Sequence, residues 1–299
     1  MRQQPVPGRE RPARRRRGGL RIWVLVAFIA YGAWYWFSNQ SVDPVTGESV
    51  LIDRSLSAED EKALGLQAYQ QILQQERWVD PDAAISRDIR NIAERLVAKV
   101  EVVEAALAAE HGMEPTRFSA GFDWEVNVID SDQANAFALP GGKMAVYTGL
   151  VPVARNEDAV AVVMGHEIAH ALLRHGAQRM AQQRLSQIGQ AAGAFSGMDP
   201  QQQQMVMAAM GYGYLLPYAR KHETEADEVG LMLAAAACYD PREAVPLWER
   251  MGQASGGQAP PEFASTHPNP GTRIANLQAL LPKALEYRAR FCEQGPLPM

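Results

Sequence analysis

The hydrophobic positions of the chain fall into patterns that predict a mostly helical α+β protein. Residues 22–37 are uncharged and apolar throughout, whereas residues 83–109 carry apolar side chains every three or four positions, as a helix with one buried face does. Residues 123–129 alternate, and residues 136–148 form two short runs around a Pro-Gly-Gly turn, which predicts a small β-sheet. Residues 159–173 are apolar around the whole circumference of a helix, so we expect that helix to be buried.

The apolar stretch near the amino terminus predicts a membrane anchor. With Leu20 included, it gives a helix about 27 Å long, close to the ~30 Å hydrocarbon core of a bilayer. Arginines precede it, and Trp34, Tyr35 and Trp36 end it, so we expect a cytoplasmic amino terminus and an aromatic belt at the outer interface. A cleaved signal peptide is one alternative, although no small-residue cleavage site follows, and a mitochondrial presequence is another.

Charge is distributed unevenly along the 299 residues. Residues 1–21 hold eight arginines and one acid, Glu10, so the rest of the chain holds 29 − 8 = 21 basic and 34 − 1 = 33 acidic residues, a net charge of −12. We therefore expect no nucleic-acid partner, because phosphate binding needs clustered Lys and Arg on the folded surface. The predicted parts are a basic cytoplasmic tail (1–21), a transmembrane anchor (22–38), a linker (39–56) and a globular domain (57–299).

The predicted buried helix contains an HExxH motif, formed by His166, Glu167 and His170. Side chains four residues apart share a helix face, so both imidazoles can bind one zinc ion while Glu167 lies beside its water. Zinc then needs a third protein ligand, and its open position holds a water whose pKa falls to about 7. Two hydrogen-bonded histidines in a buried helix are the alternative interpretation of so short a motif, so a matching carboxylate is needed to decide.

A second helical segment further along the chain supplies such a carboxylate. Glu223 and Asp227 are again four apart, so a helix would present Glu223 to zinc as the third ligand and Asp227 on the same face, able to orient a ligand imidazole. Glu225 would point elsewhere. An acidic, solvated helix face is the alternative. His175, after the HExxH helix, is interpreted as a surface or capping residue, since Glu223 already fills the third position.

Two more segments complete a set of four motifs: Asn135 to Gly142 before HExxH, and Ser265 to Pro268 after the acidic pair. In this order the motifs resemble those of the gluzincin peptidases of metallopeptidase family forty-eight, over about Leu64 to Leu281. The resemblance implies a zincin-like domain with a small β-sheet, one zinc ion per chain and endopeptidase activity with Glu167 as general base. The lack of multiple membrane spans makes the chain most similar to the BepA-like soluble-domain branch.

The resemblance implies two further functional parts. An edge strand beside the HExxH helix would bind extended substrate through backbone hydrogen bonds. His267 would lie in a loop beside the zinc and would either donate a hydrogen bond to the oxyanion or plug the open zinc position, with a plain surface histidine as the alternative. Residues 189–213 predict either a simple helical hairpin or a mobile lid over the cleft. The matching edge-strand residues are Asn135, Ala136, Phe137, Ala138 and Leu139.

Together these features predict a membrane-anchored zinc endopeptidase that acts on unfolded or misassembled envelope proteins. We expect a single-pass protein of the bacterial inner membrane with a periplasmic catalytic domain, and a mitochondrial inner membrane is the alternative. A chaperone-like or scaffolding protein with a closed zinc site is the alternative function, against which the intact Glu167 argues. Cys238 and Cys292 would face an oxidising compartment and either form a bridge or remain two buried thiols.

Overall fold

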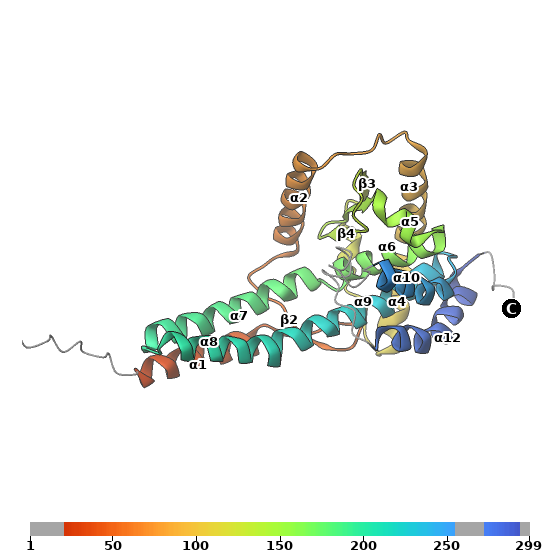
Figure 1. Ribbon diagram of the computed structural model, residues 1–299. Helices are drawn as coiled ribbons and strands as arrows, with labels where there is room; N and C mark the ends of the chain where they lie inside the picture. The colour runs from red at the N-terminus through yellow and green to blue at the C-terminus, as the bar shows by residue number, and fades with distance from the viewer. Residues whose placement is uncertain (1–20, 255–271, 294–299) are drawn as a thin grey trace, which may run out of the picture.

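The computed structural model describes residues 21–254 and 272–293, which are mostly helical with one small sheet, as the sequence predicts, and a second, two-stranded sheet within the predicted linker. A body holds the larger sheet and most of the helices, and an elongated arm made of α1, α7 and α8 projects from it (Figure 1). The described helices are α1 Ile22–Ser38, α2 Ala58–Gln75, α3 Ala84–Val97, α4 Val100–Glu110, α5 Val151–Ala154, α6 Glu157–Leu172, α7 His175–Ser196, α8 Pro200–Met210, α9 Leu216–Ala236, α10 Ala244–Ala254 and α12 Arg273–Phe291. Short 3-10 turns are η1 Phe118–Gly121, η2 Thr148–Leu150 and η4 Pro241–Glu243, and a π-helical turn, η3 Gly211–Leu215, joins α8 to α9. The strands are β1 Gln40–Val42, β2 Ser49–Leu51, β3 Glu125–Ile129, β4 Ala136–Leu139 and β5 Lys143–Tyr147.

The larger sheet has the strand order β3-β5-β4, and β4 forms one edge beside α6. β3 runs parallel to β5, whereas β4 runs antiparallel to it with Ala138 opposite Met144. The Asn135 carbonyl accepts a hydrogen bond from the Tyr147 amide. Because pairing alternates along an antiparallel strand, the backbone groups of Ala136 and Ala138 point away from β5. Among the described residues no strand pairs with this outer edge.

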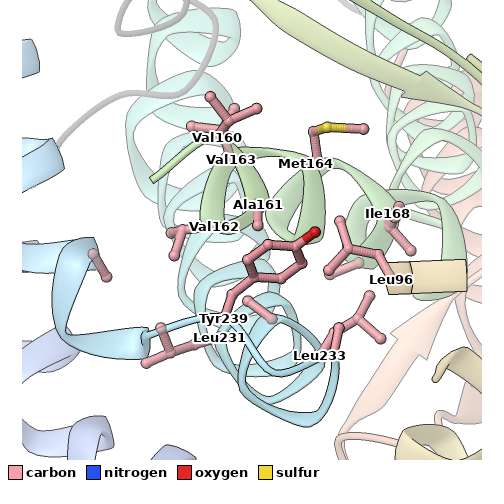
Figure 2. Close-up of a cluster of buried hydrophobic side chains, with 14 of the residues drawn as sticks. Leu96, Val160, Ala161, Val162, Val163, Met164, Ile168, Leu231, Leu233 and Tyr239 are labelled. Atoms are coloured by element: carbon pink, nitrogen blue, oxygen red, sulfur yellow. The ribbon is translucent and has the colours of Figure 1, made fainter. Parts of the chain in front are cut away.

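Helix α6 begins after a capping residue, Asn156, and is buried along most of its length. The Asn156 side chain accepts a hydrogen bond from the Ala159 amide, which satisfies one of the free donors of the first turn. Every residue from Ala159 to Leu172 is buried. Figure 2 shows the resulting core, in which side chains of α6 lie against Leu96 of α3 and Leu233 of α9. The body is therefore built around α6.

Two glycines let α6 and α9 approach at backbone distance. A Cβ atom added to Gly165 would lie 2.7 Å from the carbonyl oxygen of Gly230, and one added to Gly230 would lie 2.6 Å from the amide nitrogen of His166. Both separations are shorter than carbon can tolerate beside backbone atoms, so a side chain at either position would force the helices apart. The contact fixes the distance between the two motif-bearing helices.

The arm contains the predicted anchor and the predicted hairpin. Helix α1 packs along α7, where Phe28 stacks on Phe195 with ring centroids 6.2 Å apart. The hairpin is confirmed, since α7 ends at Ser196 and α8 begins at Pro200, but it extends along α1 away from the body instead of covering it (Figure 1). Within residues 21–254 and 272–293, no helix combines the length and the apolar character needed to cross a membrane.

The prediction of one continuous helix over residues 83–109 is wrong, because the chain forms two helices there. α3 ends at Val97 and α4 begins at Val100, with a turn at Ala98 and Lys99 between them. The turn redirects the chain so that Leu96 of α3 and Val103 of α4 both lie in the core. A single straight helix would follow the same periodicity, so the pattern alone does not reveal the turn.

A disulfide bond joins Cys238 to Cys292, with their Cα atoms 5.0 Å apart. It links Cys238, two residues after the end of α9, to Cys292, the residue that follows the end of α12. Of the two alternatives left open by the sequence, the structure shows the bridge.

We expect Gly230→Ala to weaken both folding and zinc binding, because its methyl group overlaps the α6 backbone. Overpacking of this kind lowers the free energy of unfolding by about 1–3 kcal/mol. The matched control is Gly176→Ala in α7, where an added Cβ meets nothing within 4 Å; removing this helical glycine should be neutral or slightly stabilising. Chemical denaturation of both variants measures the effect, and equal stability would contradict the packing argument.

Candidate metal centre

Two helices supply the side chains of the predicted metal site. His166, Glu167 and His170 lie on α6, and Glu223 and Asp227 lie on α9. All five side chains are buried, with exposed fractions between 3% and 9%. Because residues four apart share one face of a helix, each helix presents a pair of groups across the glycine contact.

The two imidazoles and the Glu223 carboxylate converge on one point. The Nε2 atoms of His166 and His170 lie 3.0 Å apart, and Glu223 carboxylate oxygens lie 3.4 and 3.5 Å from them. A tetrahedral zinc ion with bonds of about 2.0–2.1 Å needs ligand atoms about 3.3–3.4 Å apart. The three residues therefore fit zinc in number, chemistry and spacing, and they form a cluster able to hold a metal ion.

The Asp227 carboxylate lies on the other side of the His166 ring. Its Oδ1 atom is 3.0 Å from His166 Nδ1, so the ring can donate a proton to Asp227 while Nε2 faces the metal position. Burial alone would lower the pKa of His166, but hydrogen bonds to Asp227 and Glu223 raise it to about 9 in the metal-free protein. Protons and zinc therefore compete for this ring.

Arg273 is a site residue that the sequence analysis did not identify. It is the first residue of α12 and only 1% exposed. Its guanidinium hydrogen-bonds Asp227, approaches Glu223 to 3.4 Å, and lies over the Trp248 ring at 3.4 Å from the centroid. One buried cation thus faces the carboxylates of Glu223 and Asp227. Its only signal in the sequence is its place six residues after His267.

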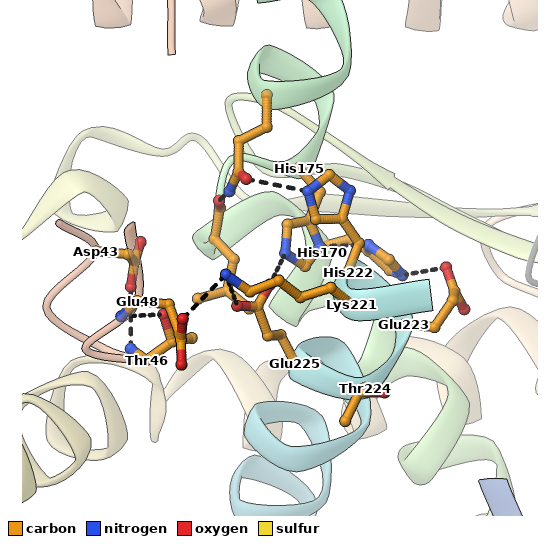
Figure 3. A network of polar contacts seen from close by, with 12 residues as sticks. Asp43, Thr46, Glu48, His170, His175, Lys221, His222, Glu223, Thr224 and Glu225 are labelled. Atoms are coloured by element: carbon orange, nitrogen blue, oxygen red, sulfur yellow. Dashed lines mark hydrogen bonds and ion pairs between the residues drawn. The ribbon is translucent and has the colours of Figure 1, made fainter. Parts of the chain in front are cut away.

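A second polar cluster lies directly beside the first one. His175 packs its ring on His222 with centroids 4.1 Å apart, and its Nε2 atom is 3.3 Å from Glu225 (Figure 3). Burial lowers the pKa of His175 to about 3 and that of His222 to about 2, and burial raises the pKa of Glu225 to about 7. The prediction of a surface or capping role for His175 is wrong, because the residue is 1% exposed. Glu225 does point away from the zinc position, as expected.

The remaining predicted residues fall into two groups. Ala136 to Leu139 form the edge strand β4, which lies against α6, and Asn135 directly precedes it. His267 and its motif, Ser265 to Pro268, lie outside the described residues.

An HExxH helix whose histidines meet a glutamate from a second helix, beside the free edge of a small sheet, defines a zinc metallopeptidase. The sequence profile of peptidase family M48 matches residues 94–281. The chain belongs to peptidase family M48, whose metallopeptidases are zinc-dependent, and it is a zinc metalloendopeptidase.

Relatives occur in mitochondria and in bacteria. The mitochondrial metalloendopeptidase OMA1 of Schizosaccharomyces pombe is 35% identical over 267 residues, which cover 88% of this chain and 72% of that protein. The mitochondrial metalloendopeptidase OMA1 of Homo sapiens is 31% identical over 88% of this chain and 50% of its own length. The β-barrel assembly-enhancing protease of Escherichia coli is 31% identical over 50% of this chain and 32% of its own length.

We expect Glu223→Ala to lower zinc affinity by more than Asp227→Ala does. Removing a residue that only hydrogen-bonds a metal ligand, as Asp227 would, costs roughly 10–100-fold in affinity. The reason is that Glu223 would bind the metal directly, whereas Asp227 would act through His166. Glu228→Ala is the matched control, because this acid of the same helix is 40% exposed and pairs with Lys283. Competition with a chromogenic chelator gives the affinities, and equal losses from the Glu223 and Glu228 variants would contradict the assignment.

Proposed function

We propose that His166, His170 and Glu223 bind the single zinc ion and that Glu167 is the general base of peptide hydrolysis. The convergence of three buried ligand atoms at tetrahedral spacing carries this proposal. Asp227 would orient His166 through its Nδ1 proton, and Arg273 would hold the carboxylates of Asp227 and Glu223 in place through its guanidinium. The first three residues would therefore bind the metal, and Asp227 and Arg273 would position those ligands.

Glu167 would carry out the proton transfers of the reaction. It follows His166 on α6 and is buried at 4% exposure. Zinc, when bound, supplies a Lewis acid that polarises the scissile carbonyl and acidifies a water. Glu167 accepts the proton of the attacking water and later delivers it to the leaving amine, so one carboxylate serves both half-reactions.

We propose the outer edge of β4 as the substrate-binding strand. The backbone N–H and C=O groups of Ala138 point outward, which is the arrangement that pairs with an added extended peptide, whereas the outward N–H of Ala136 donates to Asn135 Oδ1. Backbone pairing tolerates many sequences, and this suits an enzyme whose substrates are unfolded or misassembled proteins. His267 would complete the site, either as an oxyanion donor or as a plug on the open zinc position.

We further propose that the arm holds the enzyme at a membrane. Residues 22–38 contain no charged side chain, and Trp23 and Phe37 on α1 are 74% and 76% exposed. Tyr212, in the turn between α8 and α9, is 77% exposed. Such a set of large, exposed apolar side chains indicates a surface that contacts lipid or protein. The eight arginines of residues 1–21 suit the cytoplasmic, negatively charged face of a bilayer.

The disulfide between Cys238 and Cys292 supports an oxidising compartment for the catalytic body. A periplasm on the outer side of a bacterial inner membrane meets this condition, with quality control of envelope proteins as the task. A mitochondrial inner membrane is the alternative, in line with the mitochondrial names of several relatives.

Glu167→Gln should abolish most proteolysis while leaving zinc bound. Loss of a general base costs about 10²–10⁴-fold in rate, whereas the amide keeps the volume of the carboxylate and the ligands stay unchanged. Cleavage of a fluorescently labelled unfolded protein and zinc content by mass spectrometry give the two readouts. Near wild-type cleavage by this variant would refute the proposed mechanism, and loss of zinc would show that Glu167 is a ligand.

Ala138→Pro should weaken substrate binding, because proline lacks the outward-pointing N–H of this edge position. One missing backbone hydrogen bond of about 0.5–1.5 kcal/mol lowers kcat/KM by about 2–12-fold, mainly through KM. Ala138→Gly is the control, since it keeps the N–H while removing the side chain. Steady-state kinetics on an unstructured peptide measure both variants. Equal losses from Pro and Gly would mean that β4 contributes packing and not pairing.

A further inference from the structure

We propose that His175, held by Glu225, sets the tautomer of His170 that a zinc ligand needs. His175 is therefore a positioning residue for the metal site. The proposal deepens the function proposed above and rests on the assignment of His170 as a zinc ligand.

Three buried groups form a continuous chain away from the metal position. His170 directs Nε2 toward His166 and Glu223, and its Nδ1 atom lies 2.7 Å from Nδ1 of His175. The other ring nitrogen of His175, Nε2, lies 3.3 Å from Oε2 of Glu225. His175 is 1% exposed and Glu225 9%, so water does not take over these contacts. Figure 3 shows the residues side by side at the junction of α6, α7 and α9.

The short distance between two Nδ1 atoms requires that one carries a proton and the other accepts it. If His175 carried the proton on Nδ1, a neutral His170 would be protonated on Nε2 and could not bind a metal. If His170 carries it, Nε2 of His170 is free to bind zinc, and Nδ1 of His175 is the acceptor. The tautomer of His175 thus decides whether its neighbour can be a ligand.

Glu225 favours the productive tautomer. A carboxyl group presents an acceptor oxygen in either protonation state, so Glu225 can accept a hydrogen bond from the Nε2–H of His175, which leaves Nδ1 of that ring unprotonated. Lys221 lies 3.6 Å from the other oxygen of Glu225 and 3.2 Å from Glu48, and it orients the carboxylate. Metal-binding histidines commonly need such an outer partner to fix the ring and its tautomer.

A second metal ion bound by His175, His222 and Glu225 is the competing interpretation, because their ligand atoms lie within 4.8 Å of one another. The geometry opposes it. The two rings are nearly parallel, at 16°, so their in-plane lone pairs run side by side and do not converge. His222 instead contacts Gln178 at 3.0 Å, and the Lys221 ammonium beside Glu225 would repel a cation.

The test compares zinc affinity in three variants of the full-length chain. His175→Phe keeps a ring stacked on His222 but removes the acceptor, and we expect about 10–100-fold weaker zinc binding. His175→Asn places an oxygen where Nδ1 was and should restore most of the affinity. His222→Phe removes the neighbouring imidazole, whose Nε2 contacts Gln178, and should leave the affinity unchanged. Chelator competition gives the dissociation constants, and thermal unfolding of the zinc-free proteins verifies the fold.

A nitrogen NMR spectrum of the zinc-loaded wild-type protein tests the tautomers without any variant. We expect a protonated Nδ1 on His170 and an unprotonated Nδ1 on His175. A protonated His175 Nδ1, equal affinities of the Phe and Asn variants, or a second zinc equivalent lost in His222→Phe would overturn the proposal. Failure of the zinc site itself is distinguishable, because wild-type protein would then bind no zinc and His170→Ala would change nothing.

Discussion

The structure depends on the backbone contact between Gly165 of α6 and Gly230 of α9. Hydrogen atoms alone separate the two helices there, and a single methyl group would close the gap to 2.6–2.7 Å. The contact lies directly beside His166, so the helix that supplies two imidazoles and the helix that supplies the carboxylates are held at one fixed distance. Three ligand atoms can meet at the spacing of a tetrahedron only at such a separation.

Around this contact the protein buries several ionisable groups. The buried carboxylates lie beside positively charged side chains. Arg273 faces Asp227 and Glu223, and Lys221 faces Glu225. Removing one member of such a set leaves its partner as an uncompensated buried charge, which costs more than the pair itself contributes. The polar interior thereby stabilises one geometry of the ligands and penalises others, which serves a metal site better than an apolar interior of equal volume.

The sequence predicted the elements whose signals are local, and missed contacts that only tertiary packing creates. HExxH and the acidic pair on α9 follow from helix periodicity within a few residues. Arg273 lies 46 residues after Asp227, so the sequence around either residue does not indicate that their side chains pair. His175 is buried against His170 of α6 because Arg174 takes a left-handed conformation, with φ of 54°, that redirects the chain. A glycine at this position would have indicated a left-handed conformation, whereas an arginine does not.

The disulfide between Cys238 and Cys292 closes a covalent ring that contains both Arg273 and His267, because the two cysteines lie 54 positions apart in the sequence. A loop of this length lowers the chain entropy of the unfolded state by an equivalent of about 4 kcal/mol at 25 °C. In the native state the ring also restrains the segment that carries Arg273. Both ends of this segment are held near each other, where α9 packs against α12. Reduction would release that tether while breaking no hydrogen bond of the zinc site, and thus make the persistence of the site sensitive to the redox state of its compartment.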